Sequence, residues 1–476
     1  MIREECGIFG IYGQPEAARY VYLGLHFLQH RGQESCGIIS SDQHSLYKQI
    51  GLGKVSEFFD EIKLNYLKGD QAIGHVRYST TGSPTLVNTQ PLSAMTSKGP
   101  LAIAHNGNLT NASVIREELM KNGQTFSTTS DSEVILHLIA RAPFSDIIES
   151  TQWALSQLEG AFAILVMNKD TIIAARDPHG FRPLVIGSLG EAITPAAQTY
   201  VISSEDTAFG IVGAQRIREL NPNEMVVFSN EGMRSLSISS KNSPHRQCIF
   251  ELIYFAKPSS CVFNTSVYHY RYEIGKQLAR EFPVEADYVV PVPDSGIVSA
   301  LGYSEESKIP MALGLIRSHY VGRTFIEPSQ KIRDFGVRMK FMPVREIIEN
   351  KRIILIDDSI VRGTTSKKIV QIIRDMKPKE VHFRVASPPV RFPCFYGIDF
   401  SRPEELLANK LQTLEEIARF IGVDSVGYVS IEGLFPKDIA EKNAFCRACF
   451  DGSYPTPIHN VNKESFDHEI YQANIR

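Results

Sequence analysis

Short apolar runs separated by turn-forming residues fill the first half of the chain. CGIFGIYG, LAIAHNGNL, AFAILVM and EMVVFS are each about one strand long and rich in aromatic or β-branched residues. Runs of this kind favour paired β-sheets. Between them, EVILHLIARA and TQWALSQLEG repeat apolar positions at helical spacing. We therefore expect a domain of paired sheets and helices over residues 6–236.

The second half, residues 248–456, has a different pattern. DYVVPVP and KRIILIDD are continuous apolar runs that end in acids or turn residues, as buried strands of a parallel sheet do. TTSKKIVQIIRDM places Ile369, Ile372, Ile373 and Met376 on one side of a helix. Strands alternating with helices predict an open α/β sheet. The polar segment SISSKNSPHRQ, residues 237–247, is the expected linker, and residues 457–476 form an unassigned tail.

Composition restricts the class of protein. The chain has 476 residues, enough for two or three domains, with 43% hydrophobic and 22% charged residues. A net charge of -3 argues against a nucleic-acid binder. No apolar run reaches the roughly 20 residues that span a bilayer, and acids stand where a secretory signal carries basic charge. We therefore expect a cytoplasmic enzyme without a membrane or nucleic-acid partner.

Seven cysteines, an odd number, are spread along the chain, which favours reduced thiols with catalytic or metal-binding roles. Cys6 opens the first predicted strand and, taken alone, is most simply a small buried hydrophobic residue. Three downstream segments change that interpretation: GHVRYSTTG (74–82), HNGNL (105–109) and STTSDSE (127–133). Together with Cys6 they resemble the glutamine amidotransferase domain of the N-terminal-nucleophile hydrolases, which implies an αββα sandwich.

The resemblance implies a role for each motif residue. Cys6 would attack the glutamine amide, with its own α-amino group as general base. The side-chain amide of Asn106 and the backbone N–H of Gly107 would form the oxyanion hole. The glutamine-binding residues would be Arg77 for the α-carboxylate, Asp131 for the α-ammonium group, and Thr80. Singly, Arg77 could be a surface ion pair, Asp131 a helix N-cap and HNGN a turn.

A free α-amino group on Cys6 requires that Met1 to Glu5 be removed. We therefore expect residues 1–5 to be a propeptide, cleaved at the Glu5–Cys6 bond by self-processing.

RIILIDDSIVRGTTS, residues 352–366, joins a hydrophobic strand, two acids, a loop of small residues and a helix. A bare Asp-Asp pair would more often just end a strand. The whole segment resembles the motif with which type I phosphoribosyltransferases bind phosphoribosyl pyrophosphate (PRPP). Loop N–H groups and the helix N-terminus suit a 5′-phosphate, and Gly363 lets the backbone approach closely. The implied PRPP contacts are Asp357, Asp358, Ser359, Val361, Arg362, Gly363, Thr364 and Thr365.

Two further segments resemble parts of the same phosphoribosyltransferase family. PVPDSGI, residues 291–297, resembles the pyrophosphate loop, so that Ser295 joins Asp357 and Asp358 as the implied Mg²⁺ site. Residues 323–344 resemble a loop that closes over PRPP and completes an ammonia channel. This loop carries Arg323, Lys331, Arg333, Arg338 and Lys340, of which Arg323 and Lys340 are the implied PRPP contacts. Taken alone, such a charge run is usually a solvated face.

The two halves in this order resemble the amidophosphoribosyltransferase family. The resemblance implies that glutamine supplies ammonia to C1 of PRPP, giving 5-phosphoribosylamine, glutamate and pyrophosphate at the first step of purine synthesis. It also implies allosteric inhibition by purine nucleotides such as AMP and GMP, and a homotetramer or homodimer. Lys257 and Ser259 stand where the family pattern has Arg and Asp.

Four cysteines complete the resemblance to one branch of this family, whose members have a propeptide and a 4Fe–4S cluster. Cys446 and Cys449 form CRAC, which alone could bind zinc, serve in redox chemistry or do neither. Cys248 in CIFELIYFAKP and Cys394 in RFPCFYGID are the other implied ligands. Thiolates suit zinc as well as iron–sulfur clusters, so the chemistry leaves the metal open and the resemblance favours iron. We expect Cys36 and Cys261 to be structural.

Two other functions compete with this interpretation. A different glutamine-dependent enzyme, such as glucosamine-6-phosphate synthase or asparagine synthetase, would share the first half but has no use for DDSIVRGTT. A non-catalytic PRPP-sensing regulator would have no use for Cys6, Arg77, Asn106 and Asp131.

Overall fold

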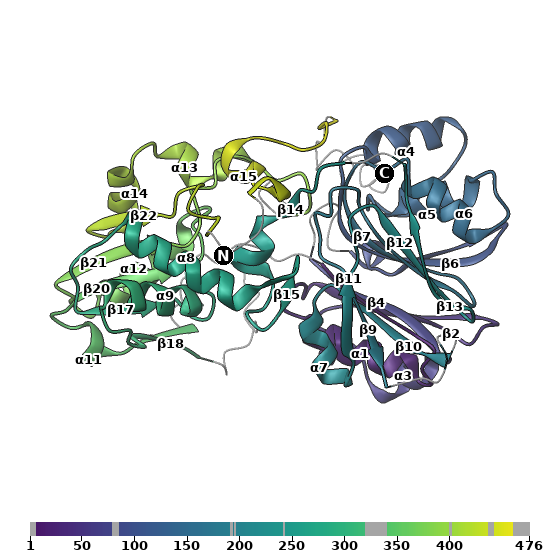
Figure 1. Ribbon diagram of the computed structural model, residues 1–476, viewed down its shortest axis with the longest axis horizontal. Helices are drawn as coiled ribbons and strands as arrows, with labels where there is room; N and C mark the ends of the chain where they lie inside the picture. Colours follow the sequence, from purple (N-terminus) through teal and green to yellow (C-terminus); the bar gives the residue numbers. More distant parts are fainter. Residues whose placement is uncertain are drawn as a thin grey trace, which may run out of the picture.

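The computed structural model describes residues 6–78, 85–190, 194, 197–240, 243–318, 340–398, 402–436 and 442–459. Two lobes lie side by side, the N-terminal lobe in purple to teal and the C-terminal lobe in green to yellow (Figure 1). Several predicted features lie outside the described residues: the propeptide 1–5, Thr80, Arg323, Lys331, Arg333, Arg338 and most of the 457–476 tail.

The N-terminal lobe contains two antiparallel sheets, built from the short apolar runs. The seven-stranded sheet has the order β11-β9-β10-β1-β4-β2-β3. Its strands are β1 Gly7–Tyr12, β2 Ser35–Ser41, β3 Leu46–Leu52, β4 Gln71–Arg77, β9 Val185–Leu189, β10 Thr199–Ser203 and β11 Gln215–Glu219. The six-stranded sheet has the order β13-β12-β8-β7-β6-β5. Its strands are β5 Leu92–Thr96, β6 Gly99–Leu109, β7 Gly160–Met167, β8 Ile172–Arg176, β12 Glu224–Ser229 and β13 Gly232–Ser237.

A core between the two sheets holds them face to face. Ile8 and Ile73 of one sheet pack with Ala104, Ala163 and Leu165 of the other. Helices α1 (Ala17–Phe27) and α7 (Phe209–Val212) cover the outer face of the first sheet. Helices α4 (Ala112–Lys121), α5 (Glu133–Arg141) and α6 (Ile147–Leu155) cover the outer face of the second (Figure 1). This arrangement confirms the predicted αββα sandwich, although α6 ends at Leu155, before the end of TQWALSQLEG.

The C-terminal lobe is built on a parallel sheet of order β17-β20-β21-β22, which confirms the predicted open α/β sheet. Its strands are β17 Tyr288–Pro291, β20 Arg352–Asp357, β21 Glu380–Val385 and β22 Ser425–Tyr428. Ile354 and Ile356 pack toward α8 (Val267–Glu281) and α9 (Ile297–Ser307). Ile353 and Leu355 pack toward α12 (Thr364–Arg374) and α14 (Leu414–Ile421). Both faces of β20 are therefore buried, which is why its sequence is continuously apolar.

Shorter elements connect these layers: α2 Val55–Phe58, α3 Glu61–Tyr66, η1 Leu86–Asn88, η3 Asp206–Ala208, β14 Gln247–Cys248, η4 Glu251–Phe255, β15 Cys261–Val262, β16 Thr265–Ser266, β18 Leu315–Arg317, β19 Phe341–Pro343, α11 Arg345–Ile348, η5 Pro403–Glu405, α13 Leu407–Lys410, η6 Lys442–Ala444, β23 Phe445–Cys446 and α15 Ala448–Asp451. In the predicted linker, Ile238 is buried and the N–H of Arg246 donates to the His179 carbonyl. Described residues of the linker therefore contact the N-terminal lobe, and its last residue, Gln247, pairs with Phe445. The domain boundaries stay predictions. No helix in the described ranges is long and apolar enough to cross a bilayer.

Candidate functional site

Cys6 lies immediately before β1, next to the end of β4. Gly7 is opposite Val76 in the antiparallel pairing of these strands, which brings Cys6 beside Arg77. The Cys6 Sγ lies 3.5 Å from the Tyr78 carbonyl oxygen. Arg77 is only 3% exposed, so it is not a surface ion pair. A buried guanidinium next to a thiol suits recognition of an anionic group on a substrate.

Asn106 and Gly107 lie on β6, in the facing sheet. A hydrogen bond of 3.1 Å between His75 Nε2 and the His105 carbonyl joins β4 to β6 just before Asn106. The Asn106 side chain is buried, and its amide nitrogen has no hydrogen-bond partner among the described residues. Gly107 has φ +147°, and a Cβ there would lie 2.1 Å from the Ala161 carbonyl oxygen, so only glycine fits. A buried, unpaired N–H donor is costly unless something else, such as an oxyanion, accepts from it.

Asp131 lies next to β6 and is fixed by several donors. The Leu109 N–H donates to its carboxylate at 3.0 Å, and the Ser132 hydroxyl donates at 3.3 Å. Ser132, not Asp131, is the N-cap residue of α5, so the capping role does not apply. A carboxylate held in this way suits a substrate ammonium group.

Sequence reasoning missed two residues of this region. His105 is buried, with Nδ1 2.9 Å from the Ser132 hydroxyl and 3.9 Å from the Asp131 carboxylate. Burial lowers the pKa of His105, so it acts as a neutral support. Arg31 donates from Nε to the Cys6 carbonyl at 3.1 Å. His105 was detectable as the first residue of HNGNL, whereas nothing in LQHRGQES singles out Arg31.

The acids that end β20 are buried together. Asp357 is 8% exposed and Asp358 is 6% exposed, and the Ser359 hydroxyl bonds to the Asp358 carboxylate. Burial, and then the charge of Asp358, raise the pKa of Asp357 well above its ordinary value. Two adjacent buried carboxylates are unfavourable without a cation, so this pair suits Mg²⁺ better than a simple strand end.

The loop after these acids leads directly into α12. Gly363, with φ +71°, precedes the first helical residue, Thr364. The loop N–H groups and the helix N-terminus thus follow Asp358 within one short turn, as a phosphate cradle requires. Arg362 is already paired through Nε with Glu405 at 2.6 Å, and the Val361 carbonyl accepts from the Leu407 N–H.

The predicted pyrophosphate loop lies at the same edge of the sheet. The Val292 N–H donates to the Ile356 carbonyl at 2.8 Å, and a Cβ on Gly296 would lie 2.2 Å from that oxygen. Ser295 is therefore held near the end of β20. Lys340 precedes β19, and its carbonyl accepts from the Ser318 N–H.

The four predicted cluster cysteines gather at one place. Cys248 and Cys446 are partners in the parallel pairing of β14 with β23. Burial, and then the neighbouring thiols of Cys394, Cys446 and Cys248, raise the pKa of Cys449 well above its ordinary value. Nevertheless, in the part of the chain that the structure describes, no group of three or more His, Cys, Asp or Glu side chains is spaced to hold a metal ion. Cys36 and Cys261 lie apart, in β2 and β15.

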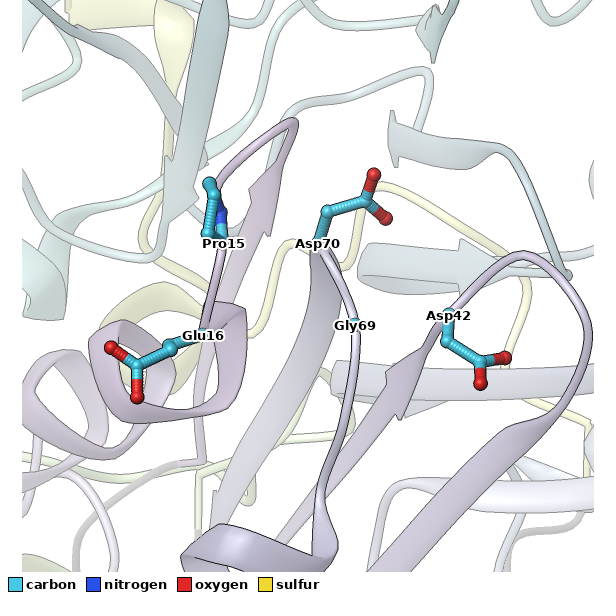
Figure 2. A pocket seen from close by; sticks show the side chains of 5 residues that line it. All are labelled: Pro15, Glu16, Asp42, Gly69 and Asp70. Atoms are coloured by element: carbon cyan, nitrogen blue, oxygen red, sulfur yellow. The ribbon is translucent and has the colours of Figure 1, made fainter.

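An open surface pocket of about 380 Å³ lies far from these motifs, lined by Pro15, Glu16, Asp42, Gly69 and Asp70 (Figure 2). In Figure 2 the three carboxylates point in different directions rather than toward a common centre. Each has a partner: Arg19 for Glu16, Tyr47 for Asp42 and Gln43 for Asp70. The pocket contains none of the predicted site residues.

Comparisons with known proteins show what the chain is similar to. Residues 75–209 match the family model of a glutamine amidotransferase domain. The chain is 50% identical over 458 residues to amidophosphoribosyltransferase 1, chloroplastic, of Arabidopsis thaliana, covering 95% of this chain and 79% of the relative. It is 47% identical over 464 residues to the amidophosphoribosyltransferase of Bacillus subtilis strain 168, covering 96% and 95%. A solved structure of the B. subtilis glutamine PRPP amidotransferase, complexed with ADP and GMP, matches with a TM-score of 0.88 and 45% identity over 96% of this chain and 98% of the other.

Proposed function

The chain belongs to the amidophosphoribosyltransferase family, and from this premise we propose how its residues divide the reaction between two sites. The family reaction is the glutamine-dependent amination of PRPP in purine synthesis, a glycosyl transfer. Glutamine hydrolysis takes place in the N-terminal lobe and PRPP amination in the C-terminal lobe. The buried amide nitrogen of Asn106, which has no partner among the described residues and lies in the sheet that faces the Cys6 sheet, carries the assignment of the first site.

At the first site, the α-amino group of processed Cys6 takes the thiol proton and Sγ attacks the glutamine amide carbon. Asn106 and Gly107 donate hydrogen bonds to the resulting oxyanion. The C–N bond breaks, ammonia leaves with the transferred proton, and water hydrolyses the thioester to glutamate. Arg77 and Asp131, with Thr80, hold the α-carboxylate and α-ammonium groups of the substrate.

At the second site, ammonia attacks C1 of PRPP and pyrophosphate leaves. The 359–365 loop binds the 5′-phosphate, and Asp357 and Asp358 face the ribose hydroxyls. Ser295, Asp357 and Asp358 would hold Mg²⁺, which would neutralise charge on the pyrophosphate. Arg323 and Lys340 would reach PRPP from the 323–344 loop, whose closure would exclude water and guide ammonia between the sites.

Cys248, Cys394, Cys446 and Cys449 would hold a 4Fe–4S cluster, supported by their common location and their thiolate chemistry. The cluster would be structural. Iron and acid-labile sulfide in anaerobically purified protein test this proposal. Bound zinc without sulfide would show instead that the four thiolates form a zinc site, which they also suit.

Purine nucleotides such as AMP and GMP are proposed as inhibitors, with the allosteric control that membership of the family implies. Competition with PRPP is also expected, because their 5′-phosphate can occupy the 359–365 loop in place of that of PRPP. A homotetramer or homodimer and a cytoplasmic location complete the proposal, although named relatives include bacterial and chloroplastic proteins.

The decisive experiment measures glutamate and pyrophosphate release by anaerobically purified protein with Mg²⁺. Glutamine alone, PRPP alone and both together are compared. We expect both products to appear together, with PRPP strongly stimulating glutamine hydrolysis. If PRPP does not change the rate of glutamate release and no pyrophosphate is released, a different glutamine-dependent synthase would be favoured instead.

A further inference from the structure

Four buried charged side chains meet where the two lobes touch. Arg31 pairs with Glu205 at 2.6 Å and with Glu251 at 2.6 Å, and Arg182 pairs with Glu251 at 3.4 Å. All four side chains are at most 1% exposed. Glu251 begins η4 of the C-terminal lobe, whereas Arg31, Arg182 and Glu205 belong to the N-terminal lobe. Each of these buried charges thus has a partner of opposite sign, which a buried cluster requires.

One side of this cluster ends on Cys6. The Nε of Arg31 donates to the Cys6 carbonyl at 3.1 Å, while its two Nη atoms bind both Glu251 oxygens, at 3.0 and 2.6 Å. A guanidinium is a rigid fork, so fixing its far side fixes Nε. Glu251 of one lobe therefore sets the position of the Cys6 backbone in the other.

The other side of the cluster ends at the oxyanion strand. Arg182 donates from Nε and Nη2 to the Tyr396 carbonyl, at 3.2 and 2.5 Å. The next residue, Gly397, lies so close to Gly107 that an added Cβ would be 3.3 Å from the Gly107 carbonyl carbon. Asn108, directly after Gly107, donates from its amide to the Phe395 carbonyl at 2.9 Å. The 395–397 backbone thus supports β6 at the proposed oxyanion hole.

We propose that Glu251 and Arg182 are positioning residues for glutamine hydrolysis, joining the C-terminal lobe to both the nucleophile and the oxyanion hole. The inference rests on the roles proposed for Cys6 and Gly107. A displacement of about 1 Å between reacting groups can cost on the order of 10²-fold in rate. Without Glu251, Arg31 loses its bidentate partner, and Cys6 loses its fixed distance from Gly107.

The test uses Glu251→Gln, which keeps the shape and removes the charge, and Arg182→Lys. Asn108→Ala removes the hydrogen bond to the Phe395 carbonyl without changing any charge, so it still tests the inference if a charge variant fails to fold. Glu219→Gln is the matched control, because Glu219 is a buried partner of Arg176 at 3.0 Å that also accepts from the Asn264 N–H across the junction. No described contact leads from Glu219 to Cys6.

The measurements are kcat and KM for glutamine, the rate of PRPP amination with free ammonia, and the rate at which a glutamine-like chloroketone alkylates Cys6. For Glu251→Gln and Arg182→Lys we expect kcat with glutamine and the alkylation rate to fall about 10–100-fold. The KM for glutamine and the ammonia-dependent rate should stay within about threefold. Asn108→Ala should show the same split with a smaller loss, and Glu219→Gln should show no split.

The inference would be overturned if Glu251→Gln and Arg182→Lys, like the control Glu219→Gln, lowered the glutamine-dependent and ammonia-dependent rates equally. That result would mean that the cluster only holds the lobes together. An unchanged alkylation rate in Asn108→Ala and the charge variants would overturn it as well. If correctly processed wild-type protein releases no glutamate, the proposed function itself fails, and the inference fails with it.

Discussion

At the residue scale, the Asn106 side chain is the feature that distinguishes β6 from an ordinary buried strand and indicates a functional site. Buried amides nearly always have partners, and the amide nitrogen of Asn106 has none among the described residues. Its neighbour Gly107 adopts a backbone conformation closed to other residues. Both features are costs to stability, and both are explained if the strand is shaped for a transient anion rather than for the resting protein.

Asn106→Ala should lower kcat for glutamine hydrolysis by about 10²–10³-fold, because one oxyanion donor is lost. The KM for glutamine should change little, since Arg77 and Asp131 are untouched, and ammonia-dependent amination should persist. Asn122→Ala is the control, because the Asn122 amide makes only an exposed contact with the Glu118 carbonyl. A higher KM for glutamine with an unchanged kcat would argue against the oxyanion role. Steady-state kinetics with both nitrogen donors decides.

The chemistry proposed for Cys6 depends on a free α-amino group. The intact mass of active protein should therefore correspond to a chain that begins at Cys6. Blocking cleavage, for example with Glu5→Pro, should abolish glutamine hydrolysis while ammonia-dependent amination continues. A full-length chain with full glutamine activity would exclude the free amine as general base. Mass spectrometry and glutamate release on the same sample provide the measurement.

At the scale of elements, apolar runs predicted the strands and helices because each run records local burial. The continuous run RIILID predicted a strand covered on both faces, and β20 is one. Contacts between residues far apart in the sequence do not show in the local pattern of apolar and polar residues. Arg31 and Glu251 are 220 positions apart, and Asn108 and Phe395 are 287 apart. A charged residue that is buried because a distant partner compensates it looks, in sequence, like any surface charge, which is why the junction was missed.

Gly363 links the proposed PRPP loop to α12, and its left-handed backbone conformation predicts the effect of a side chain. Gly363→Ala should cost about 1–2 kcal/mol from φ alone, and its Cβ would also meet Leu407 at 2.7 Å. We expect a raised KM for PRPP, because the loop before α12 must shift. Gly422→Ala is the control: φ is +95° after α14, but the nearest atom is 3.8 Å away. If both variants lose stability equally and neither changes the KM for PRPP, the loop does not bind the phosphate. Chemical denaturation and PRPP kinetics test both points.

At the scale of the whole molecule, the lobe junction depends on charge. Burial alone would raise the pKa of Glu205, but His30 and Arg31 outweigh burial and hold the pKa below its ordinary value. The N–H of Lys257 and the hydroxyl of Ser260 also donate to Glu205. The junction therefore joins the lobes through an ionised carboxylate that each lobe helps to stabilise.

A lowered pKa fixes the sign of the pH dependence. In the unfolded chain, a glutamate has a pKa of about 4.3. Ionised Glu205 therefore stabilises the folded protein above that pH, and this stabilisation is lost as the pH falls toward the lower pKa of the folded state. Glu205→Gln should therefore be less stable than wild type at neutral pH, by about 3–5 kcal/mol for a broken buried pair. This difference should shrink below about pH 4. Free energies of unfolding across this range provide the measurement, and a constant difference would show that Glu205 is not ionised.

The pairing of β14 with β23 has a consequence for how the protein is made. Cys248 opens the C-terminal lobe and Cys446 comes near its end, yet they are neighbours in one parallel pair. On the ribosome, the sheets of the N-terminal lobe are complete once β13 has emerged, whereas β14 must wait until almost all of the following lobe has been synthesised. Long-range pairing of this kind is slow and leaves apolar surface exposed meanwhile. The nascent chain therefore completes its first lobe early, and the thiols that meet at the junction assemble last.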